Sequence, residues 1–252
     1  AFMILYTWLS ARLGLVTGMT LFEATRRRFG SGLAAVGGLF GFGAIVAFQA
    51  GNTAAIGFAA QALLGGSVRW WALGFVALAV GLIYLPDLYE KLEWLVRGVV
   101  GLMMVTFVGT LAVVGIDPGA AAAGLVPSFP RPDAIFLSLG IAASTFSIVA
   151  AVYQSYLMRE KEWGPDQLAD EGLDSFLGIA LLGTMAVVIL LTSAGAIHGQ
   201  ADPVFSAQGM ARQLEPLAGP AAFYLFTVGF FFASLSSLVV NPLIGEIGRA
   251  HV

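Results

Sequence analysis

A run of apolar residues, 137–157, contains the side chains of this sequence that are best suited to bind an ion. Its polar members are Ser144, Thr145, Ser147, Tyr153, Gln154 and Ser155. Hydroxyls and amides in an apolar environment are unfavourable unless they find partners, so this cluster indicates a lined cavity. Hydroxyl and carbonyl oxygens are hard ligands, which suit Mg²⁺, Ca²⁺ or a largely hydrated ion better than soft metals.

Two local structures are compatible with the three neighbouring hydroxyls. In an intact helix, each hydroxyl can bond to the carbonyl of the preceding turn and then has no functional role. In a locally broken helix, the hydroxyls and the freed carbonyls would surround an ion. On the second interpretation, the candidate ion-binding residues are Ser144, Thr145 and Ser147, with Ser144 and Ser147 as metal ligands. Tyr153 and Gln154 are assigned to a polar pathway that continues from them.

A second polar group lies on an earlier apolar segment. Gln49, Asn52 and Thr53 have the spacing i, i+3 and i+4, which places them on one face of a helix. They could form a hydrogen-bond patch between helices or a polar path through a bundle. Neither amide can carry a proton as a carboxylate does. We include Gln49 and Asn52 in the candidate polar pathway.

Residues typical of enzyme active sites form no recognisable group. Every Asp and Glu falls in a predicted loop or near a span end; residues 159–174 are predicted as a charged loop, and Asp174 as the cap that opens the next span. The chain has no cysteine, and a phosphate-binding glycine loop and a Ser–His–Asp grouping are both absent from the sequence. We predict no catalytic residues, no cofactor and no nucleic-acid partner, so the chain is not expected to be an enzyme.

Membrane-spanning helices must position these polar groups. The chain has 252 residues, 58% of them hydrophobic and 11% charged, whereas soluble domains carry about 25% charged residues. A helix needs about 20 apolar residues to cross the membrane, and long apolar runs exclude the alternation of a barrel. The sequence predicts an all-α transmembrane bundle in the lipid bilayer, with spans at about 1–20, 36–64, 69–86, 94–116, 134–158, 174–197 and 220–245.

Basic residues are concentrated in alternate connections, which predicts the orientation of a multi-pass protein in the plasma (inner) membrane. The residues on that cytoplasmic side are Arg26, Arg27, Arg28, Lys91, Arg97, Arg159 and Lys161. We assign residues 1–246 to a single transmembrane domain, truncated at both ends. Residues 247–252 are interpreted as a non-native tail, because one reverse translation matches the start of a common sequencing adapter. The sequence does not fix the oligomeric state.

Five pieces, in order and with matching spacing, resemble the NRAMP family (natural resistance-associated macrophage proteins) of divalent-metal transporters. The pieces are LSARLGLVTGMTLFE, KLEW, GLVPSFP, the spacing from Asp174 to His198–Gly199, and FASLSS. The family usually has a glutamine where Leu235 stands. The resemblance covers what would be the second to eighth transmembrane helices of the family.

The resemblance implies a leucine-transporter-like fold of inverted repeats, in which the first and sixth helices are broken and hold the metal. The family's first-helix ligands would lie outside this chain. In the sixth helix, the Met-Pro-His motif of the family falls on Ser147, Ile148 and Val149 in an ungapped alignment, and the carbonyl ligand falls on Ser144. A shifted alignment places the motif on residues 151–153. In either alignment the methionine sulfur is missing.

The third helix of the family also differs here, since the carboxylates that the family uses to move protons fall on Gln49 and Asn52. Without the thioether, a preference for Mn²⁺ or Fe²⁺ over Mg²⁺ and Ca²⁺ is lost. Without the carboxylates, a proton path is lost. Both differences are similar to the family's divergent branch of magnesium-conducting relatives, which have a wider and more hydrated site.

These observations lead to one main hypothesis and two alternatives. The main hypothesis is a transporter of divalent metal cations, with Mg²⁺ or Mn²⁺ favoured and with weak or no proton coupling; the metal is then substrate, not cofactor. An alternative is a transporter of a small organic solute, such as an amino acid, on the same fold. The third is a membrane receptor or scaffold that transports nothing.

Overall fold

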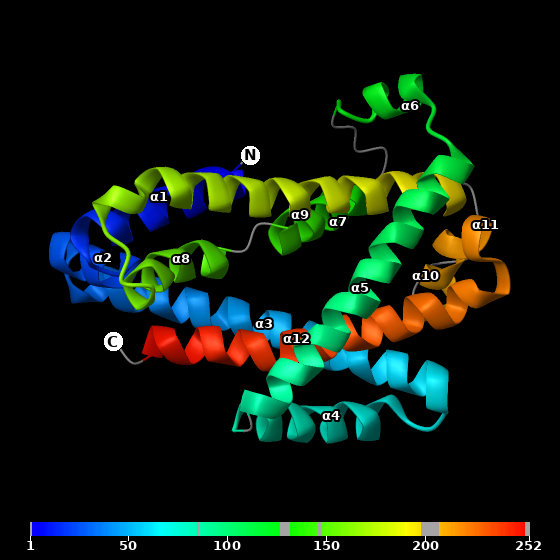
Figure 1. Ribbon diagram of the computed structural model, residues 1–252, viewed down its shortest axis with the longest axis horizontal. Coiled ribbons are helices and arrows are strands. Elements are labelled where there is room, and N and C mark those ends of the chain that lie inside the picture. The colour runs from blue at the N-terminus through cyan, green and yellow to red at the C-terminus, as the bar shows by residue number, and fades with distance from the viewer. Residues whose placement is uncertain (1, 85, 127–131, 146–147, 198–206, 250–252) are drawn as a thin grey trace. The chain divides into compact units, whose positions relative to one another are not determined.

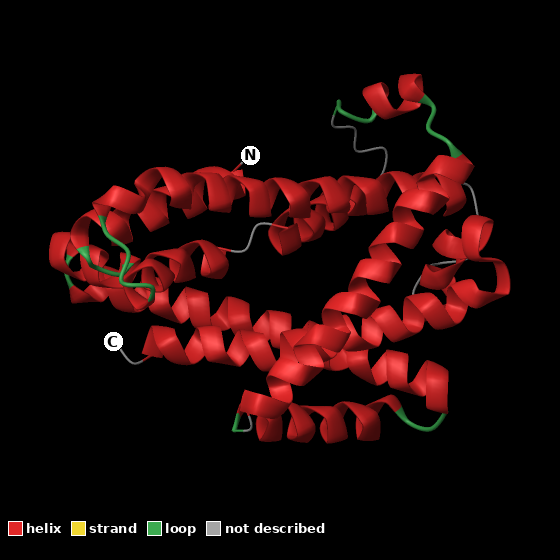
Figure 2. Cartoon of the chain, viewed as in Figure 1, coloured by secondary structure: helices red, strands yellow, loops and turns green. Residues whose placement is uncertain are grey.

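The computed structural model describes residues 2–84, 86–126, 132–145, 148–197 and 207–249, and the regular structure of these ranges is helical (Figures 1 and 2). The α-helices are α1 Phe2–Thr17, α2 Leu21–Phe29, α3 Ser31–Leu64, α4 Val68–Ile83, α5 Pro86–Val114, α6 Pro118–Ala123, α7 Pro132–Thr145, α8 Ile148–Glu160, α9 Leu168–Ile197, α10 Ala207–Ala211, α11 Glu215–Ala218 and α12 Ala222–Arg249. The 3₁₀ turns are η1 Pro165–Gln167, η2 Arg212–Leu214 and η3 Gly219–Ala221.

Six of the seven predicted spans correspond to single helices, namely α1, α3, α4, α5, α9 and α12. Among the described residues, four stretches are long and apolar enough to cross a membrane: Ser31–Leu64, Trp94–Val114, Pro165–Ala196 and Gly209–Pro242. Shorter apolar helices lie at Met3–Thr17, Val68–Ile83 and Ala134–Ala143. The all-α transmembrane bundle is therefore confirmed.

The remaining predicted span, 134–158, is two helices instead of one. The first of them, α7, ends at Thr145, and α8 begins at Ile148 (Figure 1). A local break was one of the two structures compatible with the hydroxyl cluster, and the described helices end and begin at that cluster. Residues 146 and 147, between the two described helices, lie outside the described part of the structure.

The prediction that Asp174 caps the sixth span is wrong. Helix α9 begins at Leu168, so residues 168–173 are helical and Asp174 lies in the second turn. Pro165 opens the preceding turn η1, and the backbone N–H of Gly164 donates to the side-chain oxygen of Gln167. The first turn of α9 is polar, so it lies outside the apolar run from which the span was predicted.

The chain divides into two compact units, each assembled from separate segments. Unit 1 comprises residues 1–46, 124–183 and 244–252, and unit 2 comprises residues 47–123 and 184–243. Helices α3, α9 and α12 each contribute one end to unit 1 and the other end to unit 2. The candidate pathway residues Gln49 and Asn52 therefore belong to unit 2, whereas Tyr153 and Gln154 belong to unit 1.

Unit 1 is built on close packing of α1 against α8. A Cβ atom at Gly14 would lie only 2.6 Å from the backbone oxygen of Ser155, a distance that real Cβ atoms do not show. Glycine thus allows the two backbones to approach closely, as is usual between membrane helices. Ala11, Leu15 and Met158 form the buried apolar cluster beside this contact.

Ser155 also attaches α2 to α8. Its hydroxyl accepts the backbone N–H of Leu21 at 3.0 Å and donates to the carbonyl of Val152 at 2.8 Å, and the residue is fully buried. Because Leu21 is the first residue of α2, its N–H has no partner within its own helix. The serine hydroxyl therefore satisfies a helix terminus that would otherwise be unpaired.

A capping box defines the start of α2. The backbone N–H of Glu23 donates to the Thr20 hydroxyl, and the backbone N–H of Thr20 donates to the Glu23 carboxylate. Glu23 also forms an ion pair with Arg159 of α8, with 3.1 Å between Nη1 and Oε1. This exposed pair is weak by itself, but it lies on the same two helices that Ser155 connects.

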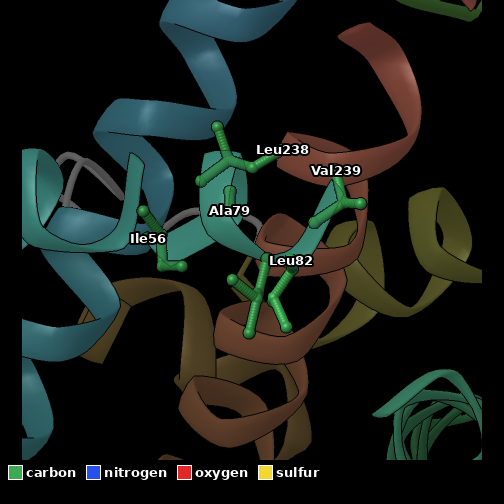
Figure 3. Close-up of a cluster of buried hydrophobic side chains, with 6 residues drawn as sticks. Ile56, Ala79, Leu82, Leu238 and Val239 are labelled. Carbon is green, nitrogen blue, oxygen red and sulfur yellow. The ribbon is translucent and has the colours of Figure 1, made fainter. Parts of the chain in front are cut away.

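Unit 2 contains two apolar cores. In the first, Ile56 of α3, Ala79 and Leu82 of α4, and Leu238 and Val239 of α12 meet (Figure 3). The buried members of the second core are Met103, Phe107, Ala211, Leu214, Ala222 and Phe226. The first core holds the α12 segment that carries Asn241 against α3 and α4.

We expect Gly14→Ala to destabilise the protein, because the added methyl group meets the backbone of Ser155 and α1 must move away from α8. Overpacking of this kind costs about 1–3 kcal/mol. The control is Gly38→Ala on α3, where an added Cβ has no neighbour within 4 Å. Thermal unfolding of both purified variants in detergent measures the difference. Equal stability of the two variants would contradict the packing described for α1 and α8.

Candidate functional site

The hydroxyl cluster lies where α7 ends and α8 begins. Ser144 and Thr145 are the last two residues of α7, and their side chains lie outside the described part of the structure, as does the whole of Ser147. The last carbonyls of a helix lack donors within it, and the C-terminal end carries partial negative charge. The described part of α7 thus ends among the residues that the sequence analysis proposed as ion ligands.

Gln49 and Asn52 take part in a hydrogen-bond network with α12, all within unit 2. The side-chain amide of Gln49 donates to the backbone carbonyl of Leu238 at 3.1 Å. Its side-chain oxygen accepts from Asn52 at 3.4 Å and from Asn241 at 3.2 Å. The structure brings the two predicted residues together and adds Asn241, which the sequence analysis did not assign to the site.

Pro242 explains why Gln49 occupies this position. In a regular helix the carbonyl of Leu238 would accept the N–H of residue 242, but proline has no N–H to donate. Helix α12 continues through Pro242, and the Gln49 amide takes the place of the missing donor. Of the two interpretations of Gln49 and Asn52, this geometry favours a hydrogen-bond patch between helices.

The other two pathway residues, Tyr153 and Gln154, lie on α8 in unit 1. Tyr153 stacks on Tyr156, with ring centroids 5.9 Å apart. The amide of Gln154 donates to the Glu171 carboxylate at 3.3 Å and to the Ser175 hydroxyl at 3.2 Å. Gln154 is thus a link between α8 and α9, and its partner Glu171 is a carboxylate.

Glu171 was missed by the sequence analysis, which placed it in a charged loop. It lies in the first turn of α9 with only 1% of its surface exposed, and it accepts a hydrogen bond from Ser175. The spacing of Glu171 and Ser175, i and i+4, was visible in the sequence. The burial was not visible, because it depends on α8 and α1 packing over this turn.

Charged metal ligands do not gather in the described part of the chain. No three His, Asp or Glu side chains there lie close enough together to hold a metal ion, and the chain lacks cysteine.

Apolar helices of this length are typical of an integral, multi-pass membrane protein. A sequence model of the family described as natural resistance-associated macrophage protein-like matches residues 1–251. The chain belongs to the Nramp family.

Several curated relatives are bacterial proteins named divalent metal cation transporter MntH. Those from Verminephrobacter eiseniae, Ralstonia nicotianae and Yersinia enterocolitica are 26%, 30% and 29% identical to the chain. The alignments cover 96%, 95% and 95% of this chain and 57%, 57% and 60% of the relatives. The chain therefore spans about three-fifths of the length of these relatives.

We expect Gln49→Leu to lower the free energy of unfolding by about 1–3 kcal/mol, because it leaves the Leu238 carbonyl and two amides without a partner. A double-mutant cycle with Pro242→Ala tests the cause. Alanine restores an N–H at residue 242, so the loss caused by Gln49→Leu should be smaller in that background. Unfolding of the four proteins in detergent measures the coupling. A loss of equal size in both backgrounds would refute the assigned role of Gln49.

Proposed function

We propose that the protein to which this chain belongs transports divalent metal cations and is not an enzyme. The observation that carries the proposal is the separation of α7 from α8 at the hydroxyl cluster, in a chain of the Nramp family. The name of the MntH relatives supports a divalent metal as substrate. The metal is then the transported ion, and the location is the plasma (inner) membrane.

We assign the ion site to Ser144, Thr145 and Ser147 together with the carbonyls at the end of α7. Hard oxygen ligands alone favour Mg²⁺ or Mn²⁺ over softer ions. With no sulfur ligand in this segment, selection against Mg²⁺ would be weak. The site would then accept an ion with several of its water molecules still attached.

Weak or absent proton coupling is the second part of the proposal. Gln49 and Asn52 stand at the positions where the family resemblance implies carboxylates, and an amide does not bind and release a proton near neutral pH. The hydrogen bond from Gln49 to the carbonyl left free by Pro242 supports a structural role for this amide. Protons would therefore have no carboxylate path through this part of unit 2.

Uptake into liposomes tests the transport proposal. We expect the full-length protein to take up Mg²⁺ and Mn²⁺ above the level of empty vesicles, with little dependence on an imposed pH gradient. Ca²⁺ and a mixture of amino acids are assayed in parallel. Amino-acid uptake without metal uptake would favour the organic-solute alternative, and no uptake of any substrate would leave only a receptor or scaffold.

Single substitutions test the assigned ligands. We expect Ser144→Ala to reduce Mg²⁺ uptake several-fold, because it removes one oxygen ligand from the ion. The control is Ser138→Ala, six residues earlier on the same helix, where the serine is exposed. Equal uptake by the two variants would remove Ser144 from the site.

A substitution at Ser147 tests the hardness of the site. Ser147→Met adds a soft thioether, so we expect the ratio of Mn²⁺ to Mg²⁺ uptake to rise several-fold. Competition between the two ions in the liposome assay measures this ratio. Ser147→Leu, which has similar bulk but lacks sulfur, is the control. A rise of the same size in both variants would show that bulk, not sulfur, is responsible.

A further inference from the structure

Glu171 is a buried carboxylate in unit 1 to which the proposed transport mechanism gives no role. Among the described residues, it is the single charged side chain that is buried. No ion pair joins it to a described basic residue, and Arg159 of α8 pairs with Glu23. A carboxylate removed from water without a cation is strongly unfavourable, and ionisable groups inside membrane proteins usually mark an ion or proton site.

The two oxygens of Glu171 have different surroundings. Oε1 accepts from the Ser175 hydroxyl at 2.5 Å and from the Gln154 amide at 3.3 Å. Oε2 is equally buried and has no hydrogen-bond partner. The carboxylate is therefore fixed in orientation through one oxygen, while the other is left to bind something else.

Two further oxygens without partners lie on α1 in the same unit. The hydroxyls of Thr7 and Ser10 are buried and make no hydrogen bond. A third buried hydroxyl without a partner, that of Thr227, lies on α12 in unit 2. Other helical hydroxyls bond to the carbonyl four residues earlier, namely those of Thr17, Thr25, Thr106, Thr110, Thr192 and Ser234. Thr7 and Ser10 are thus exceptions to the usual way in which a membrane helix satisfies a hydroxyl.

These groups belong to one core of three helices. Helix α1 packs along α8, and Gln154 of α8 bonds to Glu171 of α9. Helix α1 also meets α9 directly, because a Cβ atom at Gly172 would lie 3.5 Å from Nε1 of Trp8. Trp8 therefore contacts Gly172, the residue next to Glu171. In the sequence of α1, Trp8 lies between Thr7 and Ser10.

Charge decides which kind of ligand fits. The buried groups of this core carry one negative charge, so one univalent cation neutralises them. A divalent ion would leave a net positive charge in a medium of low dielectric constant, which is unfavourable. We propose that Oε2 of Glu171 binds one Na⁺ ion, with the hydroxyls of Thr7 and Ser10 as further oxygen ligands.

Other charged groups of the three helices are engaged or exposed. On α9, Asp170 and Asp174 are exposed to the surroundings. On α1, Arg12 lies over the Trp8 ring at 5.2 Å. On α8, Arg159 is paired with Glu23 of α2. The charges of these groups contribute to the electrostatic potential at Glu171, but none of them forms an ion pair with it.

The test compares Glu171→Gln with wild type, using full-length protein in lipid nanodiscs. Glutamine keeps the shape of the side chain and an oxygen for Ser175 and Gln154, and it removes the charge. Asp174→Asn, an exposed carboxylate on the same helix, is the matched control. Thermal stability is measured as Na⁺ replaces K⁺ at constant ionic strength. This measurement does not need divalent transport, so failure of this proposal is distinguishable from failure of the proposed function.

We expect wild type and Asp174→Asn to bind the cation and Glu171→Gln not to bind it. For wild type and Asp174→Asn, the folded-to-unfolded ratio should rise about tenfold for each tenfold increase in Na⁺ above its Kd. Wild type without this response, or Glu171→Gln with it, would overturn the proposal.

Discussion

Polar groups in an apolar medium must form hydrogen bonds within the protein. In the described part of this chain, such hydrogen bonds join one helix to another. The proline in α12 removes a backbone donor, and the amide of Gln49 on α3 replaces it. Ser155 of α8 likewise satisfies the first N–H of α2. Apolar packing alone gives little directional preference between membrane helices, because lipid is as apolar as the side chains. The few polar contacts therefore fix which helix faces meet within each unit.

Apolar runs were sufficient to predict the helices, because a span needs length and hydrophobicity and little else. They were not sufficient to predict helix starts. The first turn of α9 carries Asp170 and Glu171, so the apolar run begins later than the helix does. Three hydroxyls in four residues and the family resemblance predicted a local break as one alternative, and the described helices α7 and α8 end and begin beside these residues.

Partners distant in sequence were the part that could not be predicted. Gln49 bonds to a carbonyl 189 residues away, and nothing in its own segment indicates that choice. The burial of Glu171 depends in the same way on Gln154 and on α1. Residue type and helical spacing predicted that Gln49 and Asn52 share a face, but whether that face lines a path or bonds to a neighbour depends on α12.

Gln49 donates to the carbonyl that Pro242 leaves without a donor, and this hydrogen bond restricts the order in which residues 49 and 242 can change. An ionised carboxylate at residue 49 would place negative charge against the carbonyl of Leu238, which already lacks its helix donor. If residue 242 first regains an N–H, that carbonyl is satisfied and a carboxylate at residue 49 becomes compatible with the fold. The two substitutions are therefore epistatic, with residue 242 changing first. Backbone hydrogen bonding therefore favours a donor such as an amide at residue 49 in any chain that carries this proline, independently of any ion site.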